Sequence, residues 1–493
     1  MNSIHICKRF KNCVTGRLLG DDLRARAMRG GVCLGGGSVA EQAVRFARNM
    51  ILTRILAPSA FGAMAIVMSS SAVVGALTEV GLKHAIIQNP KGGEKDYLDT
   101  GWWMGLSRAL FTYLIIFALA PWVARIYGVE DLSTLLRVTL LGTLFDGAMS
   151  PRSALAQRHM KFGRWMIINN GGCMSGVILT VVLSYVVHDV WALAIGFGSE
   201  NAFRCILSYI FYPGIPSLRI DTCAAQDLYT FSKQAFGLSF MNLIFSRADI
   251  FVLGKLCTTT QLGLYSIGVA LVTTPSGFIT NMLSQTLIPA LSHVQQDKLR
   301  LNRILNEVTS WLIMLGLPSV AVVCLCGASL LTVVYGERYV SSAASLAVAA
   351  VVVFLNILNA AITCVFIAVG RPGLHRRAVA ASAIVMLIAT YPACKLFGIV
   401  GGQIAALLGI SVSYILQLTR IIKLTELNLI HYRRSIGKAM FVTSGIVAIS
   451  YGAHLIGIEL RPITTVILGF AGCIIAYICA ISLHMQNRHH ARI

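Results

Sequence analysis

Hydrophobic residues along this chain stand in long unbroken runs, and polar residues gather in the short segments between them. Each run has about 20 residues or more, the length that an α-helix needs to cross a bilayer. The runs predict fourteen transmembrane helices, at 32–57, 62–88, 100–125, 132–157, 164–188, 190–212, 230–255, 261–291, 304–334, 340–369, 376–395, 398–421, 436–456 and 461–484. Because membrane strands would alternate apolar and polar residues, the continuous runs favour helices. The pattern predicts an all-α polytopic membrane protein.

Composition supports a membrane location for most of the chain. Apolar residues make up 56% of the sequence and charged residues only 12%, and the mean hydropathy is +0.73. A soluble domain carries about one quarter charged residues. The chain therefore lacks the polar surface that soluble domains of its length would need, and most of it is expected to face lipid.

Lys and Arg residues are distributed unevenly between alternate connections. They crowd the N-terminal segment, every second connection and the C-terminal tail, whereas the opposite side holds only Arg125, Lys255, Arg338, Lys395 and Arg461. The positive-inside rule then predicts that both termini are cytoplasmic. The formal net charge of +21 is interpreted as topology charge beside anionic membrane lipid, because a nucleic-acid binder would collect its cations in a soluble domain. No nucleic-acid partner is expected.

The sequence carries no cofactor or metal signature. Its thirteen cysteines are scattered without a C-x-x-C pair, so we expect small buried hydrophobes rather than metal or redox ligands. It has no G-x-x-x-x-G-K-[ST] phosphate loop, which argues against direct use of ATP. Residues 1–29 lack the apolar core of a secretory signal and are predicted to form a basic cytoplasmic segment. Met1 and Met28 are both candidate starts.

The chain contains an internal repeat. Residues 51–66 read ILTRILAPSAFGAMAI and residues 252–267 read VLGKLCTTTQLGLYSI, and the two align without a gap at an offset of 201, with Gly62 over Gly263. Since both copies begin in odd-numbered spans, they share one orientation in the membrane. Transporters with such parallel repeats place the substrate path between the two halves.

Several segments carry a family resemblance. They are ARNMILTRILAPSAFGAMAIV (47–67), LTEVGLKHAIIQNPK (77–91), SPRSALAQRHMKFGRW (150–165), FSRADIFVLGKLCTTTQLGLYSIGVALVTTP (245–275) and AVGRPGLHRR (368–377). In order and spacing, over roughly residues 24–440, they resemble the polysaccharide transporters of the multidrug/oligosaccharidyl-lipid/polysaccharide exporter superfamily. The resemblance implies a lipopolysaccharide or exopolysaccharide flippase of the bacterial inner membrane. Such a protein moves a polyprenyl-pyrophosphate-linked oligosaccharide from the cytoplasmic to the outer leaflet.

The repeat and the resemblance together predict the domain organisation. The expected parts are a basic N-terminal segment (1–29), a six-helix bundle (30–213), a cytoplasmic linker (214–229), a second six-helix bundle (230–423), and two further helices with a cytoplasmic tail (424–493). The two pseudo-symmetric bundles are expected to enclose a central cleft and to move the substrate by alternating access.

Charged residues inside the predicted spans form the candidate site, because a charge that faces lipid near the bilayer centre costs a few kcal/mol or more. Glu41 and Arg45 are predicted to pair on one helix face, which Arg48 continues. At the offset of 201, Arg48 matches Asp249, so a cation and an anion are predicted to face each other across the cleft. Asp249, Glu41 and Glu79 are candidates for ion coupling.

The candidate cations suit the implied substrate. A guanidinium stays charged, and its forked donors match phosphate oxygens, so Arg45 and Arg48 are expected to bind the pyrophosphate. The family resemblance implies a role for Arg48, because in the related lipid II flippases a cationic residue at the corresponding place in span 1 lines the cavity. The alternative interpretation is a buried salt bridge that only holds the bundles together. Other charges lie nearer the ends of spans, and Arg204 in particular is interpreted as topology charge at a cytoplasmic end.

Two other functions are weighed against the flippase. A glycan-polymerising enzyme would need outer loops with acid and base groups, and the outward connections are short, so no enzyme is expected. A small-molecule or drug exporter of the same superfamily would share the bundle plan, but the cations of the first span favour an anionic substrate. The expected partners are the lipid-linked oligosaccharide, membrane lipid, and a polysaccharide polymerase with its chain-length machinery.

Overall fold

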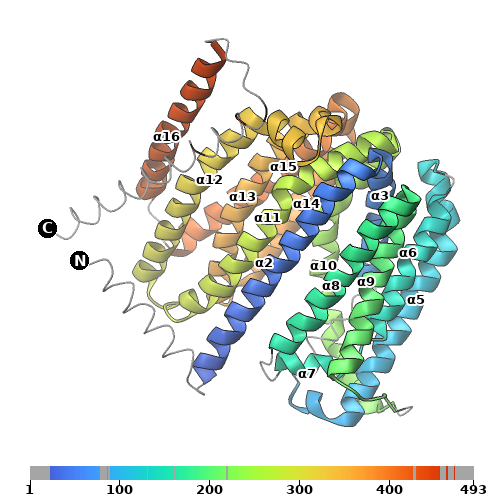
Figure 1. The fold of residues 1–493 in the computed structure, drawn as a ribbon. Helices are drawn as coiled ribbons and strands as arrows, with labels where there is room; N and C mark the ends of the chain where they lie inside the picture. Colours follow the sequence, from blue (N-terminus) through green and yellow to red (C-terminus); the bar gives the residue numbers. More distant parts are fainter. Residues whose placement is uncertain are drawn as a thin grey trace, which may run out of the picture. The chain divides into compact units, whose positions relative to one another are not determined.

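The computed structural model describes residues 23–77, 86, 89–129, 131–158, 162–217, 220–425 and 429–455, with the single residues 462, 464 and 471. Every regular element in these residues is helical (Figure 1), which confirms the all-α prediction. The elements are α2 (Leu23–Ile55), α3 (Pro58–Leu77), η1 (Pro90–Gly93), α5 (Lys95–Tyr127), α6 (Leu132–Gly147), α7 (Ser153–Arg158), α8 (Phe162–Val187), α9 (Val190–Phe211), α10 (Thr222–Leu256), α11 (Thr259–Ser292), α12 (Lys298–Val334), η2 (Glu337–Ser342), α13 (Ala343–Ala368), α14 (Pro372–Phe397), α15 (Ile399–Thr425) and α16 (Leu429–Leu455).

The helices follow the predicted spans closely. Each of the first thirteen predicted spans overlaps a helix, and the last, 461–484, lies outside the described residues apart from three isolated positions. Eight of the described helices are long and apolar enough to cross a membrane. One span was predicted too long: α6 ends at Gly147, and α7 follows as a separate short helix. Pro151 stands between them, and a proline ring cannot continue an α-helix without the loss of a backbone hydrogen bond.

The chain divides into two compact units. Unit 1 comprises Met1–Arg48 and Ser71–Ser239, and unit 2 comprises Asn49–Ser70 and Phe240–Ile493. The boundaries therefore fall inside α2, α3 and α10, not in the connections between helices. The division into six-helix bundles at 30–213 and 230–423 stays a prediction.

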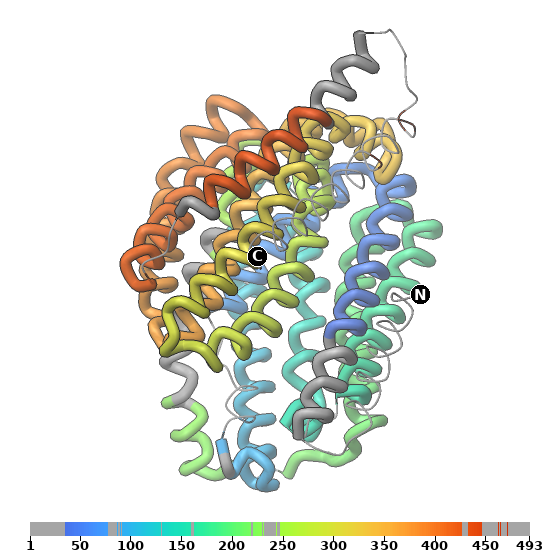
Figure 2. Tube along the Cα trace, turned by 90° about the vertical axis from the view of Figure 1, so that its left-hand side faces the viewer, coloured from blue at the N-terminus to red at the C-terminus, as the bar shows by residue number. Residues whose placement is uncertain are grey.

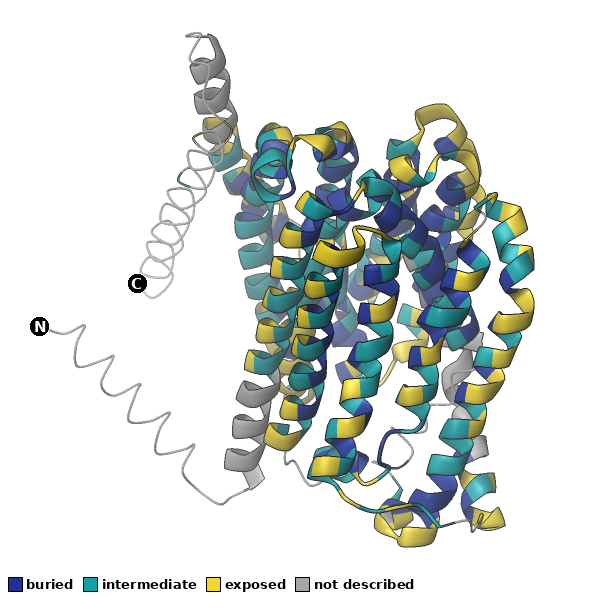
Figure 3. Ribbon diagram, turned by 45° about the vertical axis from the view of Figure 1, so that its right-hand side comes forward, coloured by how far each residue is buried: buried dark blue, intermediate teal, exposed yellow. Residues whose placement is uncertain are grey.

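Unit 1 is built from long antiparallel neighbours. Helix α5 packs on α6, α6 on α9, and α9 on α8. Buried and exposed positions alternate along these helices (Figure 3). Large apolar side chains point outward, among them Phe111 and Trp122 on α5 and Ile178 and Tyr185 on α8. A helix in lipid presents such side chains to hydrocarbon, since its backbone hydrogen bonds are already satisfied.

Unit 2 has α13 at its centre. Helix α13 packs against α11, α12 and α15, while α14 pairs with α15 and α16 with α12, as the neighbouring red and yellow helices of Figure 2 show. Its core includes the fully buried Val365 and Phe366 of α13 together with Ile421 of α15. The packing buries apolar faces of α11, α12 and α15 against α13.

Candidate functional site

The predicted pair on α2 is present. The Arg45 guanidinium donates to Glu41 Oε1 from both Nη2, at 3.0 Å, and Nε, at 3.2 Å. The spacing of four residues places the two side chains on one face of the helix, as expected. Both side chains are about one quarter exposed.

A second pair, on α9 of unit 1, completes the cluster. Arg45 Nη2 lies 2.5 Å from Glu200 Oε1, and Arg204 Nη2 lies 2.7 Å from the same oxygen and 3.4 Å from Glu41 Oε1. We call Glu41, Arg45, Glu200 and Arg204 the charge ring. Arg204, interpreted from the sequence as topology charge, has its guanidinium in this ring, whereas its position relative to the membrane stays a prediction.

A duplicated pentapeptide builds the ring. Residues 41–45 read EQAVR and residues 200–204 read ENAFR. When two such helices lie antiparallel, each Arg comes opposite the Glu of the other helix, and this cross-pairing is what the structure shows. The similarity of the two pentapeptides is visible in the sequence alone and indicates which two helices pair.

Glycines on α8 make room for the ring. A Cβ added to Gly172 would lie 2.2 Å from Arg204 Cγ, and one added to Gly176 would lie 2.6 Å from Glu200 Cβ and 2.9 Å from Glu200 Cα. No side chain fits at these distances, so α8 and α9 approach backbone to backbone. Small residues allow helices in membranes to pack this closely.

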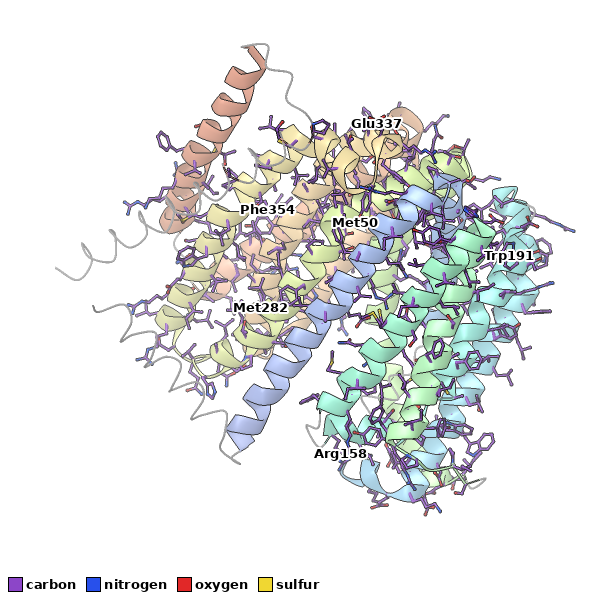
Figure 4. The ribbon with its side chains drawn as sticks, in the orientation of Figure 1. Met50, Arg158, Trp191, Met282, Glu337 and Phe354 are labelled. Atoms are coloured by element: carbon purple, nitrogen blue, oxygen red, sulfur yellow. The ribbon has the colours of Figure 1, made fainter. Side chains whose placement is uncertain are left out.

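Two labelled residues show where the helices of unit 1 begin and end: Trp191 lies near the start of α9, and Arg158 lies at the end of α7 (Figure 4).

The charge ring is electrically neutral as a whole. Two carboxylates face two guanidiniums, so the cost of placing each charge in a low-dielectric site is offset by its partners. The Glu200 side chain is only 4% exposed, whereas Arg204 and Glu41 are 20% and 24% exposed. Among the described residues, Arg204 Nε has no hydrogen-bond partner. The ring is therefore partly exposed at Arg204 and Glu41, while the Nε donor of Arg204 is buried.

The ring does not favour a metal ion. Ligand atoms of Glu41, Cys173 and Glu200 lie within 4.8 Å of one another. However, the two guanidiniums already contact the oxygens of both carboxylates. A cation at this place would meet two positive charges, so the donor set fits anion exchange better than metal binding.

Asp249 lies in a different polar cluster, inside unit 2. Its buried carboxylate accepts a hydrogen bond from the Tyr265 hydroxyl on α11 and, through Oδ1, one of 2.9 Å from the backbone N–H of Ile250. Gln403 Nε2 on α15 donates to the same hydroxyl at 2.6 Å. Gly402 leaves space here, because a Cβ at that position would lie 3.2 Å from Asp249 Cβ.

The remaining predicted site residues have different outcomes. Arg48 is half-buried on α2, nearly one turn beyond Arg45. Glu79 lies outside the described residues. The facing of Arg48 and Asp249 across a cleft stays a prediction. The sequence thus identified Glu41 and Arg45 correctly as neighbours and missed Glu200 and Arg204.

These features define a multi-pass membrane protein with buried ion pairs between its helices. Residues 51–344 match the family of polysaccharide biosynthesis proteins. The match covers more than half of the chain, and the chain belongs to this family.

Curated relatives share the family character at low identity. The chain is 23% identical over 299 residues to an uncharacterised membrane protein in the cps region of Klebsiella pneumoniae, covering 60% of the chain and 61% of the relative. It is 21% identical over 374 residues to the lipopolysaccharide biosynthesis protein WzxC of Escherichia coli K12, covering 74% and 73%. It is 24% identical over 277 residues to the succinoglycan biosynthesis transport protein ExoT of Rhizobium meliloti, covering 55% of each. The match thus spans less than two thirds of the first and third of these relatives.

Solved structures show the same fold. The lipid II flippase MurJ in an inward closed conformation superposes with a TM-score of 0.75 at 10% identity, covering 93% of this chain and 99% of the other. A multidrug resistance MATE transporter in an inward-facing conformation gives 0.59 at 14% identity, covering 78% and 96%. At such identities the likeness concerns the fold alone.

Proposed function

We propose that the protein flips polyprenyl-pyrophosphate-linked oligosaccharide repeat units across the inner membrane, by alternating access, for exopolysaccharide or lipopolysaccharide biosynthesis. The match of residues 51–344 to polysaccharide biosynthesis proteins carries this proposal, since that stretch contains both copies of the internal repeat. The names of WzxC and ExoT, one a lipopolysaccharide biosynthesis protein and the other a transport protein, support it. The bundle division predicted at 30–213 and 230–423 supplies the two moving halves.

The charge ring handles the anionic carrier. Arg45 holds two carboxylates with charge-assisted hydrogen bonds, and a pyrophosphate offers the same kind of oxygen acceptor. The substrate competes with Glu41 and Glu200 for this guanidinium, and Arg48 extends the cationic face. A carboxylate released from Arg45 can then take up a proton or a small cation.

Energy comes from the membrane potential or an ion gradient. Moving one elementary charge across 100 mV is worth about 2.3 kcal/mol. Asp249, Glu41 and Glu79 are the proposed coupling residues, and no chemical step or cofactor is needed. Both termini face the cytoplasm, and a polymerase with chain-length machinery takes the product on the outer side.

Deletion of the gene in the source organism tests the proposal. We expect loss of the surface polymer together with accumulation of complete lipid-linked repeat units, because synthesis continues while transfer stops. Unchanged polymer and unchanged lipid intermediates, with new sensitivity to a cationic toxin, would contradict it. That outcome favours the small-molecule exporter, whose fold the MATE likeness also supports.

Complementation of the deletion strain tests the site. We expect Arg45→Ala and Arg48→Ala to accumulate in the membrane and to restore little polymer. Arg300→Ala is the matched control, because Arg300 is exposed and forms its ion pair with Asp297, three residues away. Normal polymer with Arg48→Ala would remove that residue from the proposed site.

A further inference from the structure

A cavity of about 250 Å³ lies in unit 1, where the segment between α9 and α10 (212–221) meets the starts of α5 and α7. Its lining includes Lys95, Leu98 and Asp99 of α5, Arg152 and Leu155 at α7, and Ile215 of the α9–α10 segment. Sites for drug-sized ligands have about 300–1,000 Å³, so this smaller cavity suits a single headgroup. The predicted topology places all three segments on the cytoplasmic side, at the level of the lipid headgroups.

Hydrogen bonds hold the α9–α10 segment against α5 and so shape one wall of the cavity. Ser217 donates to Asp99 Oδ2 from its backbone N–H, at 3.1 Å, and also from its hydroxyl. Trp103 Nε1 donates to the Ser217 carbonyl oxygen at 2.9 Å, and the Asp221 N–H donates to Thr100 Oγ1 at 2.9 Å. Because bonds within the protein fix this wall, the cavity is preformed, as small-molecule sites usually are.

The same segment fixes the guanidinium of Arg152. Arg152 Nη1 donates to the Pro213 carbonyl oxygen at 2.7 Å. A Cβ added to Gly214 would lie 2.5 Å from Arg152 Cζ, so the guanidinium packs directly on the backbone of Gly214. With φ at +150°, this residue has a conformation that glycine adopts readily. Pro213 uses one of the five guanidinium donors, and the exposed Arg152 side chain can offer the others to a ligand.

The charged side chains of the lining favour a ligand with one negative charge. Lys95 and Arg152 are exposed cations and Asp99 is a buried acid, so the three leave one net positive charge. Lys95 stands four residues before Asp99, but the Asp99 carboxylate bonds to Ser217 instead. The Lys95 ammonium thus stays available to a ligand. A phosphodiester carries one negative charge and matches this lining, whereas a phosphate monoester carries about −1.5 to −2.

The rim of the cavity is apolar where the α9–α10 segment passes. Ile215 lines the cavity and is 91% exposed, and Ile220 of the same segment is 60% exposed. Isoleucine side chains are unfavourable in water, but at the membrane interface they enter the boundary between headgroups and acyl chains. A polar cavity with such a rim fits a molecule that has a charged headgroup and an apolar tail.

We propose that this cavity binds the phosphodiester headgroup of an anionic phospholipid from the cytoplasmic leaflet. The phosphate oxygens accept hydrogen bonds from Lys95 and Arg152, and Ile215 inserts among the acyl chains. The bound lipid holds the α9–α10 segment on α5 and ties this end of unit 1 to the leaflet. The lining shares no residue with the charge ring, so the inference goes beyond the proposed transport function and uses only the predicted topology.

The test is native mass spectrometry of the full chain, purified in detergent and titrated with phosphatidylglycerol or phosphatidylethanolamine. Phosphatidylglycerol should bind more tightly, because the ammonium group of the other lipid adds a positive charge. Lys95→Gln should bind phosphatidylglycerol about tenfold more weakly, the effect of one lost hydrogen bond to a charged group. Lys91→Gln is the matched control, since Lys91 is exposed nearby and does not line the cavity. Lys95→Gln that folds and binds phosphatidylglycerol like Lys91→Gln overturns the proposal, as does equal binding of the two lipids.

A second measurement separates a membrane lipid from a soluble phosphodiester. Glycerophosphoglycerol, the deacylated headgroup, should bind at least about tenfold more weakly than phosphatidylglycerol. Ile215→Ser should weaken binding of the whole lipid and leave binding of the deacylated headgroup unchanged. If the deacylated headgroup binds as tightly as the lipid and Ile215→Ser changes neither, the cavity takes a soluble phosphodiester, and the membrane source is overturned. Lipid binding is measured without transport, so this inference and the proposed function can fail separately.

Discussion

The charge ring of unit 1 and the Asp249 cluster of unit 2 bury ionisable groups in different ways. In the ring, Arg45 contacts the carboxylates of both Glu41 and Glu200, and every charge has a partner of opposite sign. In unit 2, the Asp249 carboxylate accepts from a neutral hydroxyl, that of Tyr265, which is oriented in turn by the Gln403 amide. The ring is compensated by charge throughout, whereas the hydrogen bonds to Asp249 come from neutral groups.

Under the proposed function, this difference corresponds to two different tasks. A ring that is already neutral can exchange one anion for another, because an incoming phosphate replaces a carboxylate on the same guanidinium. A carboxyl held by neutral groups is destabilised as an anion and relieved by a proton or a cation. We therefore propose that the ring binds the substrate and that Asp249 takes up an ion, although Arg48 and Asp249 occupy matching places in the repeat.

Removal of Glu200, the most buried member of the ring, should have the largest effect on stability. Glu200→Ala leaves Arg45 and Arg204 facing each other without the carboxylate that lies between them. Breaking a buried pair in this way costs about 3 kcal/mol. We expect a clearly lower thermal midpoint than that of the wild type. It is measured on purified protein in detergent, by size-exclusion chromatography of samples heated to increasing temperatures.

Two companion variants show whether charge compensation is the cause. Glu41→Ala removes a carboxylate that is about one quarter exposed, so its cost should be about 1 kcal/mol or less. Adding Arg45→Ala to Glu200→Ala restores neutrality and should recover part of the loss. A double variant that is as unstable as the sum of the single variants would show that the ring members act independently.

The glycines behind the ring should give an intermediate effect. An added methyl at Gly176 would collide with the Cα and Cβ of Glu200, and overpacking of this kind costs about 1–3 kcal/mol. A gain in helix propensity of about 1 kcal/mol offsets part of this cost. Gly176→Ala should therefore lower the thermal midpoint moderately and weaken polymer export.

Gly198→Ala is the matched control for that experiment. It lies on α9 close to the ring, and a Cβ at this position meets nothing within 4 Å. It should gain propensity without a collision and should melt at or above the wild-type temperature. Equal midpoints for Gly176→Ala and Gly198→Ala would mean that α8 can move away from α9 at no cost.

Local sequence information was sufficient to predict the helices and the Glu41–Arg45 pair of the charge ring. Unbroken apolar runs predict helices because the bilayer sets their length, and the i,i+4 spacing predicts the Glu41–Arg45 pair. The break after α6 depends on the single Pro151, which a hydropathy pattern does not detect. In these cases the structure follows from residues that are close together in the chain.

The ion pairs of the ring that join α2 to α9 depend on contacts between segments that are distant in the sequence. Arg45 and Glu200 are 155 residues apart, and no periodicity along α2 indicates that α9 lies beside it. The duplicated pentapeptide marked the two segments that meet. Internal similarity was therefore the best available guide to these long-range contacts.

Substitution of Asp249 by its amide should have the smallest effect on stability and the sharpest effect on coupling. The asparagine side chain carries no charge. Its single amide oxygen can still accept a hydrogen bond from the Tyr265 hydroxyl, and only the bond from the Ile250 N–H is lost. The thermal midpoint of Asp249→Asn should therefore lie close to that of the wild type, within about 1 kcal/mol of stability. Under the proposed function, polymer export should fall because the site no longer takes up a proton or cation.

The informative comparison is with Tyr265→Phe, which keeps the carboxyl and removes its donor. This variant leaves a buried carboxylate short of a hydrogen bond, and it should lose about 1–3 kcal/mol. The two variants should therefore differ in which property changes most. Tyr265→Phe should lose stability, whereas Asp249→Asn should keep its stability and lose polymer export. If the thermal midpoint of Asp249→Asn is instead as low as that of Glu200→Ala, the Asp249 carboxylate is a charge balanced by a partner of opposite sign, as the carboxylates of the ring are. The distinction between an exchange site in unit 1 and an ion site in unit 2 would then be lost.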